Sequence, residues 1–306
     1  MTAALRTVTE PPPDADPANT IAFQGWPGAN SHVACRQVHP EMTPLPCAAF
    51  EDVIGAVHDG RARLAMIPIE NSVAGRVADI HHLLPDSGLH IVGEHFQRVR
   101  HQLLGLPGTD LGDIVQVHSH VHALGQCRAF IRKIGVEPVV AADTAGAARQ
   151  IAEWGDRSRA AIASTLAAET YGLEILASDI EDAEHNTTRF VVMAREPDWP
   201  SAVAPRPEAG FVTSFVFEVR SVPAALYKAL GGFATNGVNM TKLESYMVAG
   251  RFSQARFYAD VEGHPEDTGL RYAFEELGFF SKNFTVLGVY PAHPFRRDPS
   301  QEAGGD

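Results

Sequence analysis

The residues best suited to chemistry form one polar cluster directly before an apolar run. The run is Phe190–Ala194, and the cluster before it reads EHNTTR, from Glu184 to Arg189. Polar groups beside a buried strand are costly unless they find partners or a ligand. Arg189 could bind a carboxylate through two parallel hydrogen bonds, or it could form a structural ion pair within the chain. The sequence leaves both roles open.

Hydroxyl residues recur where predicted strands give way to predicted helices. Helix capping alone explains each of them, because Ser and Thr accept hydrogen bonds from free N–H groups at a helix start. Together they indicate more, since such junctions gather at the carboxyl ends of the strands in an open α/β sheet, where ligands bind. Helix starts also favour anions, so the pattern predicts a site for a small organic acid. The residues are Ser31, Ser72, Ser119, Thr144, Ser164 and Thr165.

These residues need a scaffold, and residues 20–194 supply alternating apolar runs and stretches of helical spacing. Ile21–Phe23, Leu64–Ile69 and Ala160–Ala163 are predicted strands. Each leads through a polar turn into a predicted helix, which is typical of an α/β sheet with helices on its faces. Residues 211–291 instead predict the order β-α-β-β-α-β of a ferredoxin-like fold.

Three further segments have the composition of connections and tails. Residues 195–210 contain four prolines in a polar stretch, which predicts a semi-rigid linker. Residues 1–19 predict a disordered tail and residues 292–306 a second tail. Residues 118–131 show helical periodicity from about His120, and we predict one helix through Leu124, Cys127 and Ile131.

Composition excludes several classes of protein. The chain has 306 residues, 45% of them hydrophobic and 20% charged, as expected for a soluble globular protein of about two domains. No apolar run approaches the ~20 residues that span a membrane, and the N-terminus lacks a secretory signal. Three scattered cysteines fit a cytoplasmic location. A net charge of −12 argues against binding nucleic acid.

The sequence contains no convincing motif for a nucleotide-binding site or a metal site. No GxGxxG follows a strand, and Gly232–Gly237 continues with Val238-Asn239 in place of the Lys-Ser/Thr of a phosphate-binding loop. His118, His120 and His122 would share one face of a continuous strand, as a metal site requires, but the helical periodicity breaks that face. We therefore predict neither a nucleotide cofactor nor a metal.

Five motifs together resemble those of the prephenate dehydratase family. In order they are Gly25–His32 (GWPGANSH), Ile69–Val77 (IENSVAGRV), Ser119–Cys127 (SHVHALGQC), Asp143–Ala148 (DTAGAA) and Asn186–Phe190 (NTTRF). Residues 211–291 resemble the ACT regulatory domain that follows in that family. The resemblance implies a two-lobed catalytic domain over residues 20–194, similar to type II periplasmic binding proteins, with substrate between the lobes. An α+β ferredoxin-like ACT domain would follow it.

The implied reaction is the decarboxylating dehydration of prephenate to phenylpyruvate in phenylalanine biosynthesis, without cofactor or metal. Thr188 matches the threonine regarded as proton donor or hydrogen-bonding partner of the departing hydroxyl, with Glu70 as the nearest ionisable alternative. Arg189 fits a carboxylate-binding or site-ordering role. The other implied catalytic residues are Asn71 and Ser72, and the implied substrate-binding residues are Ser31, Ser119, Gln126, Thr144 and Phe190.

The resemblance also implies phenylalanine as an effector and assembly as a homodimer or homotetramer. The effector would bind at a subunit interface, at residues Ala225, Leu226, Asn239, Glu244 and Ser245. Here the sequence departs from the family, because Ala224 stands in place of a glycine and Tyr246-Met247 in place of Arg-Pro. Two other readings remain open: dehydration of arogenate, which carries an amine where prephenate has a keto oxygen, and a non-catalytic amino-acid sensor.

Overall fold

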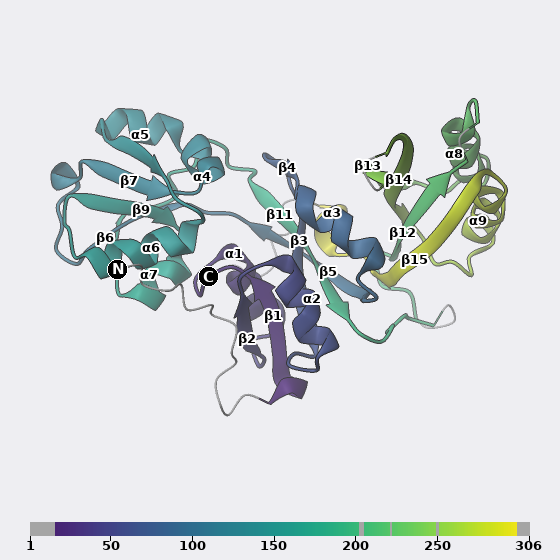
Figure 1. The fold of residues 1–306 in the computed structure, drawn as a ribbon, viewed down its shortest axis with the longest axis horizontal. Coiled ribbons are helices and arrows are strands. Elements are labelled where there is room, and N and C mark those ends of the chain that lie inside the picture. The colour runs from purple at the N-terminus through teal and green to yellow at the C-terminus, as the bar shows by residue number, and fades with distance from the viewer. Residues whose placement is uncertain (1–15, 202–204, 221, 249–250, 299–306) are drawn as a thin grey trace. The chain divides into compact units, whose positions relative to one another are not determined.

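The computed structural model describes residues 16–201, 205–220, 222–248 and 251–298, and the chain divides into two compact units (Figure 1). The first unit combines the described residues up to Arg76 with Gln97–Phe190. The second combines Val77–Phe96 with the described residues from Val191 onward. Strands β5 (His90–Arg98) and β11 (Thr187–Ala194) begin in one unit and end in the other.

The first lobe of unit 1 is built on a sheet with the strand order β11-β3-β1-β2. Strand β1 (Thr20–Gln24) pairs in parallel with β2 (Thr43–Cys47) on one side and β3 (Leu64–Asn71) on the other. A short strand β4 (Gly75–Arg76) folds back on the end of β3. Ile21, Ala22 and Phe23 are fully buried, as expected where a parallel strand is covered on both faces. Helices α1 (Asn30–Val38) and α2 (Phe50–His58) pack against these strands.

The second lobe of unit 1 has its own five-stranded sheet, in the order β10-β6-β9-β7-β8. Its strands are β6 (Gln102–Gly105), β7 (Gln116–Ser119), β8 (Glu137–Val140), β9 (Arg159–Ala163) and β10 (Glu174–Ala177). Strands β7, β8 and β9 are parallel, and β6 runs antiparallel to both of its neighbours. Two α/β lobes in one unit confirm the predicted two-lobed fold.

The helices of the second lobe are α4 (Val121–Gln126), α5 (Arg128–Ile134), α6 (Thr144–Trp154) and α7 (Thr165–Tyr171). Helices α4, α6 and α7 begin where the parallel strands of this lobe end, and α5 follows directly after α4. The prediction of one helix through residues 120–131 is wrong, because the backbone leaves helical geometry at Cys127. The carboxylate of Asp182 accepts the N–H groups of Arg128 and Ala129 at 3.0 and 3.1 Å, so it caps the second helix as a separate element.

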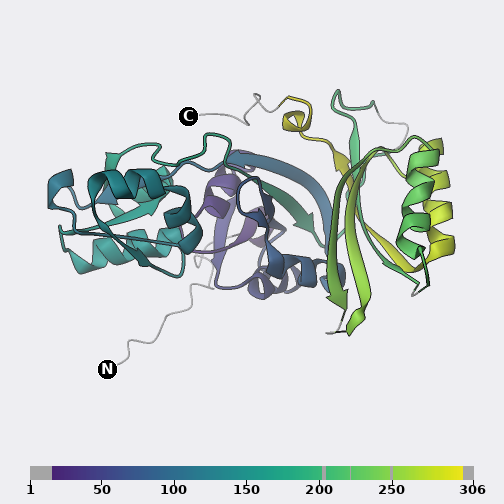
Figure 2. The same ribbon diagram turned by 90° about the horizontal axis from the view of Figure 1, so that it is seen from above.

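In unit 2, residues 211–291 have the predicted order β-α-β-β-α-β. The elements are β12 (Phe211–Val219), α8 (Ala225–Thr235), β13 (Met240–Val248), β14 (Arg251–Glu262), α9 (Thr268–Phe280) and β15 (Ser281–Pro291). The antiparallel sheet has the order β13-β14-β12-β15, and both helices lie on one of its faces (Figure 2). Phe215, Phe233 and Phe274 fill the space between helices and sheet. The topology is ferredoxin-like.

Segment 77–96, which we predicted within the catalytic domain, packs with these residues in unit 2. It contains helix α3 (Ala78–Leu83) and most of β5. Strand β5 pairs with β15, where a Cβ on Gly288 would lie 2.2 Å from the carbonyl oxygen of Ile91. Only a glycine allows that close an approach.

The predicted N-terminal tail is partly ordered. Pro17–Asn19 form a 3-10 turn, and the Asp16 carboxylate accepts the N–H of Ala18 at 3.0 Å. A capped turn that leads directly into β1 is fixed by its own hydrogen bonds. Residues 1–15 of this predicted tail lie outside the described residues.

The predicted C-terminal tail is ordered as far as Asp298. Pro294–Arg296 form a 3-10 turn, and Arg296 donates to both carboxylate oxygens of Glu94 at 2.7 and 2.9 Å. The Glu94 side chain is fully buried, and a buried carboxylate needs a charged partner. This ion pair explains why the segment does not fray; residues 299–306 lie outside the described part of the chain.

Candidate active site

The side-chain amide of Asn71, at the end of β3, lies at the centre of the candidate site. Its Oδ1 accepts the backbone N–H groups of Val73 and Ala74 at 2.9 and 2.7 Å. These two bonds fix which end of the amide is oxygen, so Nδ2 must act as donor. It donates to Thr188 Oγ1 at 2.9 Å and to Asn186 Oδ1 at 2.8 Å.

Thr188 therefore receives a hydrogen bond and still has its own hydroxyl hydrogen to give. Its side chain is nearly buried, with 9% of its surface exposed. Among the described residues, none accepts the Thr188 hydroxyl hydrogen. The polarity of this contact leaves Thr188 ready to donate to a ligand.

The same network reaches the second lobe of unit 1. Asn186 Nδ2 donates to Gln126 Oε1 at 3.0 Å, and His101 Nε2 lies 2.8 Å from that same oxygen. Gln126 is the last residue of α4, whereas Asn71 and Thr188 belong to the first lobe. Sequence reasoning did not single out Asn186 or His101 as site residues. Asn186 lies within the NTTRF motif, but no motif includes His101.

Arg189 forms the structural ion pair that the sequence left open. Its side chain is 2% exposed, and Nη1 lies 2.9 Å from Glu70 Oε1. Because Glu70 and Arg189 occupy neighbouring strands, the pair fixes the ends of β3 and β11 on which Asn71 and Thr188 stand. The pair also occupies Glu70, the predicted alternative acid.

Ser72 and Ser119 both use their hydroxyl groups within the protein. Ser72 Oγ donates to the carbonyl of His185 at 2.6 Å and accepts the N–H of Thr187 at 2.9 Å, which ties β3 to the start of β11. Ser119 Oγ donates to the carbonyl of Ile162 at 2.6 Å and is fully buried. The Ser119 hydroxyl hydrogen is therefore bonded to β9, and its predicted contact with substrate stays a prediction.

The remaining predicted substrate-binding residues differ in how exposed they are. Phe190 is 1% exposed and packs in the core, and its predicted contact with substrate stays a prediction. Ser31 lies in the first turn of α1 and is 7% exposed. Thr144 is half-buried at the start of α6, where Asp143 caps the helix through the Gly146 N–H at 2.6 Å. Thr144 and Gln126 remain candidates for binding a carboxylate.

The loop of residues 24–29 makes further contacts between the two lobes of unit 1. Ser164 Oγ donates to the Gly28 carbonyl at 2.6 Å, and the Tyr171 hydroxyl donates to the Pro27 carbonyl at 2.8 Å. The Arg149 guanidinium lies over the Trp26 ring, 4.1 Å from its centroid. This cation–π contact gives Trp26 a packing role between the lobes.

His32, which lies in the same lobe as Gly28, fixes the position of Gly28. The Gly28 N–H donates to His32 Nδ1 at 3.0 Å, which requires an unprotonated nitrogen. Burial, reinforced by Arg36, lowers the pKa of His32 to about 4, so the ring accepts this bond at neutral pH. Gly28 has a φ of +89°, and a Cβ there would lie 2.6 Å from Ala167 Cα. The lobes approach this closely only because residue 28 is a glycine.

The three alternating histidines do not converge on one point. His118 packs edge-on against Trp154, with ring centroids 5.1 Å apart, and His120 caps α4. Within the described ranges, no group of three or more His, Cys, Asp or Glu side chains could hold a metal ion. Burial raises the pKa of all three cysteines, that of Cys47 to about 11, so none provides a ready thiolate.

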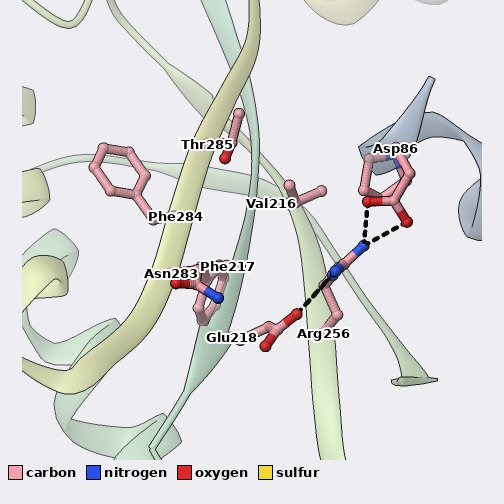
Figure 3. A pocket seen from close by; sticks show the side chains of 9 residues that line it. Asp86, Val216, Phe217, Glu218, Arg256, Asn283, Phe284 and Thr285 are labelled. Atoms are coloured by element: carbon pink, nitrogen blue, oxygen red, sulfur yellow. Dashed lines mark hydrogen bonds and ion pairs between the residues drawn. The ribbon is translucent and has the colours of Figure 1, made fainter. Parts of the chain in front are cut away.

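Two cavities lie in unit 2. One, of ≈ 340 Å³, is lined by the sheet face and by Pro85 and Asp86 (Figure 3). There Arg256 donates to Asp86 at 3.2 and 3.3 Å and to Glu218 at 2.9 Å, so its guanidinium is already paired with two carboxylates. None of the predicted effector residues lines this cavity.

The other cavity, of ≈ 530 Å³, is lined by residues 219, 220 and 222–227. The predicted effector residues Ala225 and Leu226 belong to this lining, whereas Asn239, Glu244 and Ser245 do not. One chain by itself therefore does not bring the five residues together. Ala224 has a φ of +60°, a conformation that favours the glycine of the family motif.

None of the helices in the described part of the chain has both the length and the apolar character needed to cross a membrane.

The fold and the site together define a two-lobed α/β enzyme with an uncharged alcohol, oriented by amides, at its centre. The chain belongs to the prephenate dehydratase family, whose family model matches residues 21–198. A bifunctional N-acyl-homoserine lactone acylase/prephenate dehydratase of Komagataeibacter europaeus is 58% identical over 279 residues, which cover 91% of this chain and 98% of that protein.

Two other relatives extend the comparison. Arogenate dehydratase/prephenate dehydratase 1 of Arabidopsis thaliana is 38% identical over 285 residues, covering 89% of this chain and 71% of that protein. The crystal structure of the Arthrobacter aurescens prephenate dehydratase in complex with L-Phe has a TM-score of 0.79 at 30% identity, covering 89% of this chain and 90% of that one. The resemblance inferred from the motifs is thereby confirmed.

The first prediction concerns Gly28. We expect Gly28→Ala to lower kcat/KM for the reaction proposed below by about 10-fold or more, because the added methyl group meets the backbone of α7 and misplaces one lobe against the other. Gly172→Ala is the matched control: Gly172 also has a positive φ, +66°, but a Cβ there meets open space. Equal losses in the two variants, at equal thermal stability, would contradict the role given to this contact.

Proposed function

We propose that this protein converts prephenate to phenylpyruvate, carbon dioxide and water in phenylalanine biosynthesis. The observation that carries the proposal is the bond from Asn71 Nδ2 to Thr188 Oγ1, which leaves the Thr188 hydroxyl hydrogen available. In the reaction, the bond between the ring and its carboxylate breaks, and its electron pair moves through the ring and expels the C4 hydroxyl. A proton added to that leaving group completes the water.

Thr188 assists this departure chiefly as a hydrogen-bond donor. A neutral threonine is a weak acid, so stabilising the charge that develops on the leaving oxygen contributes at least as much as transferring the proton. The ring gains aromaticity, and this supplies the driving force without a redox cofactor. The protein's remaining task is to hold a substrate with two carboxylates in one orientation.

Three side chains can supply donors for that task. Gln126 accepts two hydrogen bonds at Oε1, so its Nε2 hydrogens can bind a carboxylate. Thr144 stands at the start of α6, where free N–H groups and the helix dipole favour an anion. We assign these two residues to substrate binding, with Ser31 at the start of α1 as a third.

The second prediction tests Thr188. Thr188→Val keeps the shape of the side chain but removes the donor, and we expect kcat for prephenate to fall by about 10²- to 10⁴-fold. Thr188→Ser should retain most of the activity. The measurement is the formation of phenylpyruvate, followed by its absorbance in alkali.

Thr187→Val is the control for this experiment, because the neighbouring threonine makes no side-chain hydrogen bond within the described part of the chain. Wild-type kcat in Thr188→Val would remove Thr188 from the mechanism. Absence of product with the wild-type protein would overturn the proposed reaction itself.

Arogenate is the alternative substrate for the same chemistry. The Arabidopsis relative is named for both substrates, and arogenate would yield phenylalanine directly. The same assay with arogenate, read as phenylalanine formed, compares kcat/KM for the two substrates. Turnover of either one argues against the non-catalytic sensor considered from the sequence.

A second candidate function comes from the Komagataeibacter relative, whose name includes N-acyl-homoserine lactone acylase activity. Its 58% identity across nearly the whole chain favours testing this protein for the same activity. The buried cysteines offer no activated thiol for such an amide hydrolysis. Incubation with an N-acyl-homoserine lactone, followed by measurement of the released fatty acid, tests whether this protein has acylase activity. The same assay with Thr188→Val shows whether both activities share one site.

Regulation by phenylalanine is part of the proposal. The Arthrobacter relative was crystallised with L-Phe, and the ferredoxin-like fold of residues 211–291 matches the predicted ACT domain. The cavity that includes Ala225 and Leu226 offers space for a small effector. We propose that the effector site is completed by a second subunit in a homodimer or homotetramer, and that the enzyme works in the cytoplasm.

The third prediction tests this effector site. Val222 lines the cavity and is 55% exposed, so Val222→Glu should fold normally but place a charge where an apolar ring would bind. We expect added phenylalanine to inhibit the wild type and Val222→Glu to need about 10-fold more of it, with the uninhibited rate unchanged. Val115→Glu, 60% exposed in unit 1, is the matched control. Equal inhibition of all three proteins would exclude this cavity.

A further inference from the structure

We propose that His101 is a positioning residue: its Nε2–H holds the amide oxygen of Gln126, so that the Gln126 Nε2 hydrogens remain directed to a carboxylate of the substrate. This inference rests on the proposed function, because it assigns a role within the same site. His101 belongs to none of the family motifs found in the sequence and lies 87 residues before Thr188 in the chain.

The backbone sets the direction of every hydrogen bond in the network. The N–H groups of Val73 and Ala74 fix Asn71 Oδ1 as an acceptor, so Asn71 Nδ2 donates to Asn186 Oδ1. Asn186 must then present Nδ2 to Gln126, whose facing atom is consequently the oxygen.

The tautomer of His101 follows from this direction. An amide oxygen only accepts, so the ring nitrogen 2.8 Å away, Nε2, must carry the hydrogen. The ring is 3% exposed, and burial lowers the pKa of His101, which keeps it neutral at pH 7 and leaves Nδ1 without a hydrogen. The backbone on either side is fixed as well: the Glu181 carboxylate accepts the His101 N–H at 2.9 Å, and the His101 carbonyl accepts the Ile180 N–H at 2.9 Å.

Two donors, Asn186 Nδ2 and His101 Nε2, therefore bind Gln126 Oε1. The nitrogen end of the same amide, Nε2, is consequently the end that can bind a ligand. Within the described residues, no acceptor binds Gln126 Nε2, and the residue is only half-buried. Without His101, a single bond from Asn186 would hold the amide, and rotation would turn its oxygen toward the substrate. An oxygen in that place would repel a carboxylate that the nitrogen attracts.

Kinetics separate this role from that of Thr188. Gln126 would bind a carboxylate equally in the ground state and in the transition state, so His101→Leu should raise KM for prephenate about 5- to 10-fold, with a small change in kcat. Loss of the Thr188 hydroxyl should instead lower kcat. His101→Gln places an N–H donor near the former Nε2 and should restore KM, which a purely space-filling role would not.

A double-mutant cycle tests whether His101 acts through Gln126. Gln126→Ala alone should raise KM, and adding His101→Leu should then have no further effect. Independent, additive losses in the double variant would overturn the proposal. His101→Phe, which keeps a ring but has no N–H donor, carries the same test if His101→Leu does not fold.

A second measurement does not depend on turnover. Nitrogen NMR of ¹⁵N-histidine-labelled protein should show His101 as the neutral Nε2–H tautomer at pH 7, and Gln126→Ala should relax that preference. The Nδ1–H tautomer in the wild type would overturn the proposal even if prephenate is converted. The predicted tautomer without conversion of prephenate would instead mean that the proposed reaction has failed and that His101 orders a site for another ligand.

Discussion

The structure of the active site depends on the orientation of one amide. Two backbone N–H groups in the turn after β3 fix the oxygen of Asn71, and every other hydrogen-bond direction follows from that. Thr188 becomes an acceptor toward the protein and a donor toward the ligand, and Asn186 is turned to Gln126. A charged acid is not needed where an alcohol is oriented in this way, because the site supplies a fixed dipole at the place where charge develops.

Polar side chains that bind other parts of the protein keep this amide network in place. Ser72 ties the end of β3 to the start of β11, and the Glu70–Arg189 pair joins the same two strands two residues away along each strand. On the other lobe, Ser164 binds the carbonyl of Gly28. Ser72, Glu70 and Arg189 lie within family motifs, yet each contacts the protein. A motif residue therefore marks the site without necessarily touching the substrate.

Some residues of the site could be predicted from the sequence and others could not, depending on the contacts that each side chain makes. The order of strands, turns and helices was predictable from apolar runs, and Asn71, Thr188 and Gln126 came from motifs that the structure brings together. The burial of Ser119 and Phe190 could not be predicted, because spacing cannot show which way a side chain points. His101 was missed, because its only signal is a contact with a residue 25 positions away.

The fold was less predictable where long-range contacts override local composition. Strand β2 has two prolines in five residues and was not predicted, but it lies at the edge of the sheet, where a missing donor is tolerated. The ordered C-terminal segment depends on the pairing of Arg296 with Glu94, some two hundred residues earlier. No local pattern in the sequence reveals such a partner.

The direct test of the central claim is kcat for prephenate in Asn71→Asp. This carboxylate still accepts the N–H groups of Val73 and Ala74, but it offers an acceptor where Asn71 offered a donor, so Thr188 should turn its hydrogen toward residue 71. We expect kcat to fall by about 10²-fold or more in a folded protein. A folded Asn71→Asp variant with the wild-type kcat would contradict it.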